Sequence, residues 1–311
     1  MSITTKAKQA TILFSDIRGF TSISERFPAK QVVQLLNKHF EIMGNIIARY
    51  GGRIDKYMGD AIMVTFDTER PEKDSVLNTI ACAIEMQNAM EEVNEFGQKL
   101  NMDKLFMGIG INTGSVVACT LGSEHHWEDT VIGDQVNVAA RVESFCLRGQ
   151  ILISENSYEY AKEYIKTGTV NEVSAKGKKQ TIKIYEVLKT TRPKELNAPE
   201  RDGRRSPRLE VEIPIKFQKI EDKKILDTLL AGTIRDLSYG GISLQTPMRI
   251  DKFSDLRLQV SLSLIGNEIS DVYAKVLRVR KVDGQFDIGM EFTTIDEKAA
   301  KSLKSFIDSN L

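Results

Sequence analysis

The hydrophobic pattern of this 311-residue chain changes its period once, at about residue 190. Up to there, apolar residues recur in short continuous runs or at three- and four-residue spacing, which is typical of alternating strands and helices. Beyond residue 208 they alternate strictly with polar residues, as in LEVEIPIKF over residues 209–217, which is the period of a strand with one buried face. The change of period therefore predicts two domains of different fold class.

The first domain, residues 1–190, is expected to mix helices with strands. A helix is predicted over residues 29–50, where it ends at the glycine pair Gly51-Gly52. Further helices are predicted over 75–97 and 136–146, and strands over 10–17, 53–58, 61–66, 106–119 and 130–132. The order βαββαβ predicts an α/β (α+β) domain of the ferredoxin-like type, with helices over one face of a mainly antiparallel sheet.

Residues 191–203 are expected to link this domain to a second one, because they contain two prolines, many charges and few apolar side chains. In residues 204–311, repeated segments of period two predict a small all-β barrel. These segments are 209–217, 256–264 and 286–292. A closing helix is predicted over 296–309.

Composition narrows the class of function. The 43 Lys and Arg residues equal the 43 Asp and Glu residues, which argues against a protein that binds nucleic acid or an anionic membrane through excess positive charge. Cys82, Cys119 and Cys146 are too few and too scattered for a disulfide framework or a CxxC metal site. No apolar run reaches the roughly 18 residues of a membrane helix, and no signal-peptide pattern is present. We therefore expect a cytoplasmic protein.

The stretch FSDIRGFT, residues 14–21, places Asp16 at the end of an apolar strand. Asp and Gly are common in turns, so a plain strand-end turn is one interpretation. The other is a carboxylate that binds Mg²⁺ beside a loop whose backbone N–H groups hold phosphates.

The stretch DKYMGDAIMVTF, residues 55–66, supplies a second carboxylate, Asp60, on the turn of the expected hairpin. Asp60 can meet Asp16 if the two strands are neighbours in the sheet. Two carboxylates over a pair of divalent ions suit phosphoryl-transfer chemistry. Taken alone, Gly59-Asp60 is also compatible with an ordinary hairpin turn.

The stretch DTVIGDQVNVAARVES, residues 129–144, predicts a helix with Asp134 as its N-cap. Asn137 and Arg141 are four residues apart and so share one helical face. Such a polar face is often only solvated. Asn and Arg together can instead orient a ribose and neutralise charge on a phosphoryl group in its transition state.

In this order, the three motifs resemble the catalytic domain of class III nucleotidyl cyclases over about residues 8–190. The resemblance implies conversion of a nucleoside triphosphate to its 3′,5′-cyclic monophosphate and pyrophosphate, with two divalent metal ions, Mg²⁺ or Mn²⁺, as cofactors. It implies metal binding by Asp16, Ile17 and Asp60, transition-state stabilisation by Asn137 and Arg141, and substrate binding by Ile17, Gly19, Phe20, Thr21 and Lys176.

The same resemblance assigns the reading of the purine base to Lys56 and Thr130. An ammonium can donate to adenine N1 and a hydroxyl can accept from the N6 amino group, whereas guanine presents donors at N1 and N2 and is better matched by a carboxylate. Guanylyl members of the family typically carry Glu at the position of Lys56. We therefore expect an adenylate cyclase that uses ATP, with guanylate cyclase as the alternative.

Class III sites form between two subunits, so the resemblance implies a symmetric homodimer with two equivalent sites. An alternative of another class is a catalytically silent, cyclase-like scaffold that senses nucleotides. The presence of Asp16, Asp60, Asn137 and Arg141 argues against that alternative.

The stretch RDGRRSPR, residues 201–208, carries four arginines just before the first barrel strand. A basic linker is often only solvated, but arginine favours planar recognition of phosphates and of guanine. Together with DLSYGGISL, residues 236–244, this stretch resembles the PilZ domain, a six-stranded barrel that binds cyclic di-GMP. The resemblance implies a cyclic di-GMP site formed by Arg204, Arg208, Asp236, Ser238 and Gly241, with Arg205 as a competing choice among the arginines.

We accordingly expect cyclic di-GMP to regulate the cyclase through the barrel. In the alternative, the first domain is still the enzyme, but the barrel is a protein-interaction module.

Overall fold

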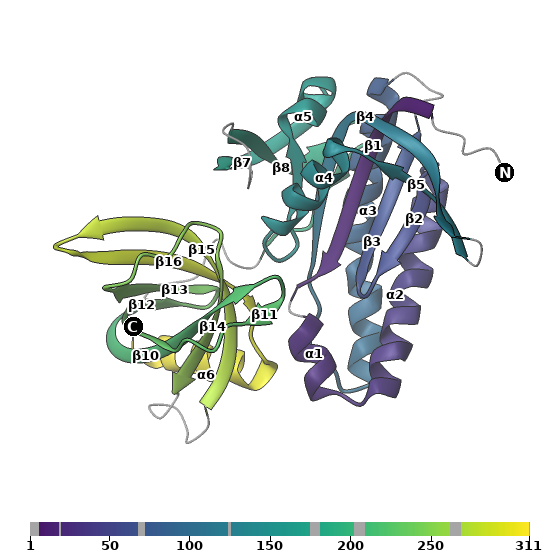
Figure 1. Ribbon diagram of the computed structural model, residues 1–311. Coiled ribbons are helices and arrows are strands. Elements are labelled where there is room, and N and C mark those ends of the chain that lie inside the picture. The colour runs from purple at the N-terminus through teal and green to yellow at the C-terminus, as the bar shows by residue number, and fades with distance from the viewer. Residues whose placement is uncertain are drawn as a thin grey trace. The chain divides into compact units, whose positions relative to one another are not determined.

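Figure 1 shows the computed structural model of the chain, which describes residues 6–18, 20–67, 72–123, 126–174, 181–201, 209–261 and 269–310. The chain divides into two compact units. One contains β1 (Lys6–Ile17) and residues 26–200, and the other contains the chain from Arg201 onward.

The elements before residue 200 are, in chain order, β1 (Lys6–Ile17), α1 (Phe20–Arg26), α2 (Ala29–Arg49), β2 (Arg53–Met58), β3 (Ala61–Asp67), α3 (Glu72–Lys99), β4 (Met107–Ser123), β5 (His126–Ile132), α4 (Asp134–Ser144), β6 (Ile151–Ser154), α5 (Glu155–Ala161), β7 (Ile165–Ser174), β8 (Thr181–Thr190) and β9 (Leu196–Asn197). The three predicted helices and the five predicted strands of this part are all present, with bounds shifted by a few residues.

The sheet of the first unit has the strand order β2-β3-β1-β4-β6-β8-β7, with β5 paired to β4 and β9 paired to β8. All pairs are antiparallel except that of β4 with β6. This arrangement confirms the predicted α/β class and the mainly antiparallel sheet. Strand β1 lies between β3 and β4, so its C-terminal end lies beside the turn of the β2–β3 hairpin.

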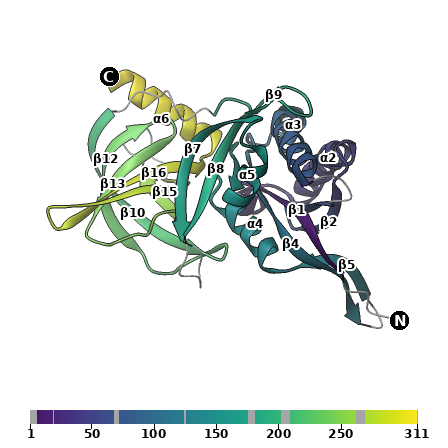
Figure 2. The ribbon, with the colours of Figure 1, turned by 90° about the horizontal axis from the view of Figure 1, so that it is seen from above.

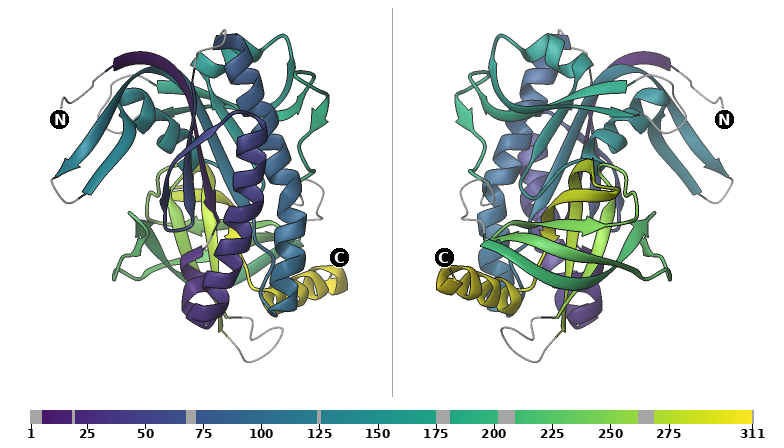
Figure 3. Two further views of the ribbon diagram at one scale, coloured as in Figure 1. Left: turned by 90° about the vertical axis from the view of Figure 1, so that its right-hand side faces the viewer. Right: turned by 90° about the vertical axis from the view of Figure 1, so that its left-hand side faces the viewer.

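Helices cover both faces of this sheet, so the prediction of helices over one face is wrong (Figure 3). Helices α2 and α3 lie on one face, while α4 lies on the other, where Ala139 packs with Ile12 and Phe14 of β1. A Cβ at Gly110 of β4 would stand 2.1 Å from the backbone nitrogen of Glu143. Glycine at this position therefore permits the close contact between α4 and β4.

The start of α4 also differs from the prediction. Asp134 is the first residue of the helix, and its N-cap is Gly133, with a φ of 144° and no side-chain cap. Glycine adopts this backbone conformation readily, so the chain turns into the helix one residue earlier than expected. Asp134 still places a negative charge in the first turn, which is the favourable sign at a helix N-terminus.

The second unit is a closed barrel. Its elements are β10 (Leu209–Glu221), β11 (Lys224–Ile225), β12 (Leu230–Ser238), β13 (Gly241–Thr246), β14 (Asp255–Ser261), β15 (Ile269–Val282), β16 (Gln285–Thr294) and α6 (Glu297–Asn310). Six strands follow the order β10-β12-β13-β16-β15-β14, and pairing of β10 with β14 closes the ring. Figure 2 shows α6 beside the barrel; Leu303 and Ile307 of this helix join the barrel core around Phe217 and Leu244. The predicted six-stranded barrel and closing helix are confirmed.

Part of the expected linker is anchored on the first unit. Strand β9 pairs with β8, and the side-chain amide of Asn88 donates to the carbonyl of Asn197 at 3.2 Å. Among the helices of the described ranges, none is both long and apolar enough to cross a membrane.

Candidate active site and ligand site

Two carboxylates lie where β1 ends beside the β2–β3 hairpin. The ladder between β1 and β3 runs up to Ser15 opposite Ile62, which brings the last residues of β1 next to the hairpin turn. There the N–H of Ile17 donates to Oδ2 of Asp60 at 3.1 Å, and Asp60 is buried. Asp16 precedes Ile17 in the same strand, so the fold brings the two predicted metal-binding carboxylates to one corner of the sheet.

The donor atoms of this corner fit a hard divalent cation, because Mg²⁺ and Mn²⁺ prefer carboxylate and carbonyl oxygens. The described residues contain no cluster of three or more His, Cys, Asp or Glu side chains, so a further protein ligand beside Asp16 and Asp60 would be a donor of another kind, such as a backbone carbonyl oxygen. The N–H of Ile17 is engaged by Asp60. Metal binding by Ile17 would use its carbonyl oxygen, because a backbone N–H is a donor and cannot ligate a cation.

A buried ion pair fixes the chain that follows β1. The guanidinium of Arg18 pairs with the carboxylate of Glu143 on α4 and also donates to the carbonyl of Glu143 at 3.2 Å. The backbone N–H of Arg18 donates to the carbonyl of Phe106 at 2.7 Å. These contacts tie the carboxylate corner to the helix that carries Asn137 and Arg141.

The two predicted base-reading residues meet around a third residue, Asp55. Lys56, on β2, places its Nζ 2.7 Å from Oε1 of Glu128 and 3.7 Å from Oδ2 of Asp55. Thr130, on β5, donates from its Oγ1 to the same Oδ2 atom at 2.6 Å. Strands β2 and β5 are not paired in the sheet, so these side-chain contacts are what joins Lys56 to Thr130.

The sequence pattern does not single out Asp55 or Glu128, because an acidic residue near a lysine on a strand resembles ordinary surface charge. Burial distinguishes the two: the side chain of Asp55 is 0% exposed, whereas that of Glu128 is 40% exposed. A charged group is rarely buried this completely without a pairing role.

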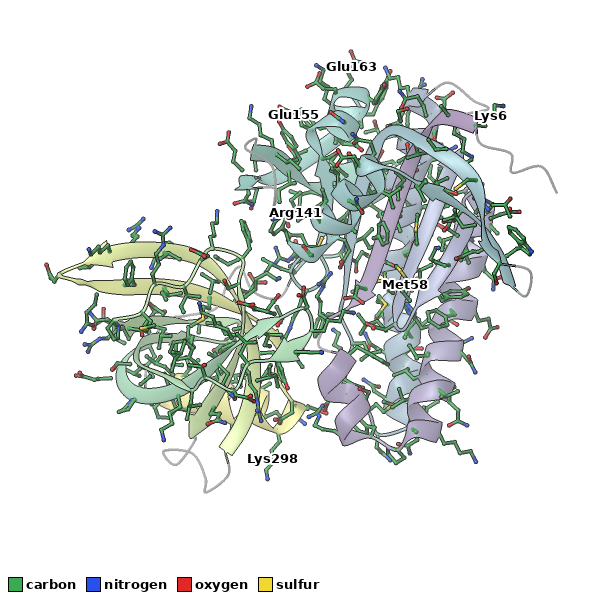
Figure 4. All side chains as sticks on the ribbon, viewed as in Figure 1. Lys6, Met58, Arg141, Glu155, Glu163 and Lys298 are labelled. Atoms are coloured by element: carbon green, nitrogen blue, oxygen red, sulfur yellow. The ribbon has the colours of Figure 1, made fainter. Side chains whose placement is uncertain are left out.

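Asn137 and Arg141 lie one turn apart on α4, as predicted. Asn137 is exposed and Arg141, labelled in Figure 4, is half-buried, with its guanidinium 5.7 Å from the ring centroid of Phe145. Burial lowers the pKa of Arg141, although an arginine remains charged at neutral pH. The pair therefore offers one amide and one cation on the same side of the helix.

Other predicted substrate-binding residues are only partly covered by the structure. Phe20 and Thr21 belong to α1. Gly19 and Lys176 lie outside the described residues, as do Arg204, Arg205 and Arg208 of the second unit.

A cavity of about 170 Å³ opens in the barrel beside the predicted ligand-binding motif. It is lined by Asp236, Ser238, Gly241, Ile242, Ser243, Leu277, Arg278, Gly289 and Met290. The structure thus brings together the three motif residues on β12 and β13 and adds Arg278, which the sequence pattern did not single out. Arg278 Nη2 donates to Asp287 Oδ2 at 3.3 Å, and Ser243 Oγ donates to the other oxygen of this carboxylate at 2.7 Å.

The described residues on either side of the arginine segment both lie at this edge of the barrel. Arg201 pairs with Glu291 on β16, and Glu291 lies opposite Gly241 in the sheet. Leu209, at the other end of the segment, lies opposite Leu237 of β12. Arg201 and Leu209, the described residues that flank residues 202–208, therefore both lie next to the motif.

Comparison with known protein families gives two matches. Residues 3–189 match the model of the adenylate and guanylate cyclase catalytic domain, and residues 202–309 match the model of the PilZ domain. The two matched ranges correspond to the two units of the structure.

Two curated proteins illustrate the similarity of the first unit. An adenylate cyclase of Anabaena cylindrica is 38% identical over 189 residues, and a terminal-differentiation specific adenylate cyclase of Dictyostelium discoideum is 35% identical over 186 residues. Each match covers 58% of this chain, but only 37% and 9% of the respective relative. The similarity therefore concerns one region of proteins that are considerably longer than the matched part.

Solved structures of both specificities are similar to this unit. The guanylyl cyclase Cya2 is 40% identical with a TM-score of 0.60, and the match covers 62% of this chain and 98% of that one. The adenylyl cyclase CyaB from P. aeruginosa is 34% identical with a TM-score of 0.58, and the match covers 61% and 98%. Overall similarity thus does not distinguish the two bases.

Proposed function

This chain belongs to the adenylate and guanylate cyclase family and carries a PilZ domain after its catalytic domain, and from that premise we propose that it converts ATP to 3′,5′-cyclic AMP and pyrophosphate. The observation that carries the proposal is the meeting of Lys56 and Thr130 at the buried carboxylate of Asp55. Sequence identity alone does not indicate which base the protein binds, because the similar structures include a guanylyl cyclase.

The choice of ATP follows from hydrogen-bond chemistry. The ammonium of Lys56 has donors only, so it matches the acceptor at adenine N1 and opposes the N1–H of guanine. The hydroxyl of Thr130 can accept from the amino group at adenine N6. A mismatched donor or acceptor in a water-poor site is unfavourable, so these two residues select against GTP.

The reaction machinery is assigned to the corner at β1 and to α4. Asp16, Asp60 and the carbonyl of Ile17 would hold two divalent ions, which when bound lower the pKa of the attacking ribose hydroxyl and bind the triphosphate. Asn137 would orient the ribose, and Arg141 would place positive charge against the phosphoryl group in its transition state.

We further propose a symmetric homodimer with active sites between its subunits. The β4–β5 hairpin extends away from the rest of its sheet as an arm (Figure 3). Leu121, Trp127 and Ile132 on this arm are all nearly half exposed. Several large apolar side chains on one projecting arm are typical of a surface that packs against another protein.

The regulatory ligand proposed for the barrel is cyclic di-GMP. Three observations support it: the cavity at Asp236, Ser238 and Gly241, the arginine Arg278 in its lining, and the positions of Arg201 and Leu209 at the same edge. Arginine forms bidentate hydrogen bonds with phosphates, so this edge suits a ligand with two phosphates and two guanines.

A product assay on the full chain tests both proposals. ATP and GTP are supplied separately with Mg²⁺ or Mn²⁺, with and without cyclic di-GMP. Cyclic AMP as the main product supports the base assignment, whereas product from GTP alone contradicts it. An unchanged rate together with no binding of cyclic di-GMP in calorimetry contradicts the regulatory proposal and favours a protein-interaction module.

Mixing two inactive variants tests the shared sites. In a mixed dimer of one Asp60→Asn subunit and one Asn137→Ala subunit, one active site carries both substitutions and the other carries neither. Mixtures should therefore recover up to about one quarter of wild-type activity, since half of the dimers are mixed and half of their sites intact. A mixture that stays inactive, although light scattering shows mixed dimers, would refute sites built from two subunits.

A further inference from the structure

We propose that Asp55 is a positioning residue that fixes the direction of the Thr130 hydroxyl and so makes the base pocket selective for a 6-aminopurine. The proposal rests on the assignment of Lys56 and Thr130 to base reading. It goes beyond that assignment, because it names the group that decides which hydrogen-bonding role Thr130 plays.

The geometry is well defined. Thr130 Oγ1 lies 2.6 Å from Asp55 Oδ2 and donates its hydrogen to it. Thr130 is 4% exposed, and the side chain of Asp55 is 0% exposed. Water therefore has little access to replace this contact, and the short distance is typical of a charge-assisted hydrogen bond.

A threonine hydroxyl has one hydrogen and two lone pairs. Free in solution, it can donate to a carbonyl or accept from an amino group, and so it does not discriminate adenine from guanine at position 6. When its only hydrogen is directed to Asp55, just the lone pairs remain. Thr130 can then accept from the amino group of adenine, but it offers no donor to the oxygen of a 6-oxopurine.

Two cationic side chains also contact this carboxylate. Arg53 Nη2 lies 3.5 Å from Oδ1 of Asp55, and Lys56 Nζ lies 3.7 Å from Oδ2. A carboxylate accepts hydrogen bonds and donates none, so it cannot exchange roles with the hydroxyl. Asp55 thus couples both base-reading residues, because one oxygen atom contacts Lys56 and Thr130 together.

Three triphosphates isolate position 6 in the wild-type protein. ATP carries a donor there, purine riboside triphosphate carries no substituent, and 6-methoxypurine riboside triphosphate carries only an acceptor, while all three keep N1 as an acceptor. We expect kcat/KM to fall in that order, with ATP at least about tenfold above the methoxy compound. Equal or faster turnover of the methoxy compound relative to unsubstituted purine would overturn the proposal without any mutation.

The variant Asp55→Ala removes the acceptor and releases the Thr130 hydrogen. We expect the kcat/KM ratio of ATP to the methoxy compound to fall by about tenfold or more, and the ratio of ATP to GTP to fall in the same direction. If Asp55 had a merely structural role, its replacement would lower kcat/KM for all substrates by the same factor and leave these ratios unchanged.

Two further variants test whether Asp55 acts on selectivity through the hydroxyl of Thr130. In Thr130→Val the hydroxyl is absent, so adding Asp55→Ala should leave the ratios as they are in Thr130→Val alone. Asp129→Asn is the matched control, because Asp129 accepts a similar hydrogen bond from Thr120 on the exposed part of the same arm. It should keep the wild-type ratios.

The same ligands are compared by equilibrium binding to the full chain, which does not depend on turnover. A wild-type preference for ATP with ratios unchanged in Asp55→Ala refutes the role of Asp55 alone. A wild-type preference for GTP refutes the adenylate assignment and this inference together, since a hydroxyl directed to Asp55 cannot donate to the guanine oxygen.

Discussion

Lys56 and Asp60 stand four residues apart on one hairpin but contact different strands. The ammonium of Lys56 lies 2.7 Å from Glu128 on β5. The carboxylate of Asp60 instead accepts from the backbone of Ile17 on β1. In the proposed dimer, the resemblance to class III cyclases assigns the base reading of Lys56 to one active site and the metal binding of Asp60 to the other.

The first prediction concerns Asp60. In Asp60→Asn, the amide oxygen can still accept from the N–H of Ile17, so the fold should persist while the charge needed for metal binding is lost. We expect cyclase activity to drop by more than about a hundredfold, with an unchanged dimer in size-exclusion chromatography. Asp103→Asn, which removes a carboxylate that pairs with Arg26 at the surface, serves as the control and should keep its activity. Wild-type turnover in Asp60→Asn would contradict the metal-binding role.

The second prediction concerns the contact between α4 and β4. A Cβ at Gly110 would lie 2.1 Å from the backbone of Glu143, so Gly110→Ala should push α4 away from the sheet. We expect a loss of about 1–3 kcal/mol in the free energy of unfolding, measured in urea, and reduced turnover because Asn137 and Arg141 move with the helix.

Gly44→Ala on α2 is the matched control for this variant. A Cβ there would meet only Ile54 Cδ1, at 3.7 Å, and alanine favours a helix by about 1 kcal/mol over glycine. This control should be as stable as the wild type or more so. Equal stability of Gly110→Ala and the wild type would show that α4 does not depend on the glycine.

The third prediction concerns pH. His39 on α2 is fully buried, neither of its ring nitrogens has a hydrogen-bond partner in the described structure, and burial lowers its pKa to about 4. Since the unfolded chain takes up this proton at a higher pH than the folded one, stability is lost as the pH falls below about 6.5. The expected loss is about 1.4 kcal/mol per pH unit down to about pH 4.

The variant His39→Leu has no proton to bind and should lack this component of the pH dependence. The check is urea unfolding of both proteins at pH 7.5 and pH 5.5, monitored through the circular dichroism of the helices. If the wild type and His39→Leu lost the same free energy of unfolding between pH 7.5 and pH 5.5, the acid sensitivity would belong to other groups.

The fourth prediction concerns the barrel. Arg208→Ala should weaken cyclic di-GMP binding by at least about tenfold in calorimetry, because a charge-assisted contact to phosphate or guanine is lost. Arg235→Ala is the charge-matched control, since Arg235 is exposed and pairs with Gln245 and Glu212. An equal loss in both variants would indicate a general charge effect and not a specific site.

The sequence predicted most of the elements, because hydrophobic period and turn residues act locally. The nearness of Asp16 to Asp60 was expected only if their strands were neighbours, and the pairing of β1 with β3 provides this. It did not predict α4 on the second face of the sheet, which depends on the absence of a side chain at Gly110. It also placed the N-cap of α4 at Asp134, where the conformation of Gly133 prevails.

The role of Asp55 was beyond the reach of sequence patterns. Nothing in DKYMGD separates a buried acceptor from a surface charge, since the difference arises only when β5 brings Thr130 against β2. The same applies to Arg278, which reaches the barrel cavity from a strand about forty residues after the motif. Contacts between strands that are distant in sequence leave no local signature.

The buried pair of Arg18 and Glu143 has a consequence for stability. Within one chain it joins the carboxylate corner to α4, and in the proposed dimer these two parts serve opposite active sites. The pair is largely shielded from water, and a protein that keeps one of these charges buried without its partner is strongly destabilised. Removal of either partner would therefore be expected to loosen the carboxylate corner and α4 together, although only one residue has been changed.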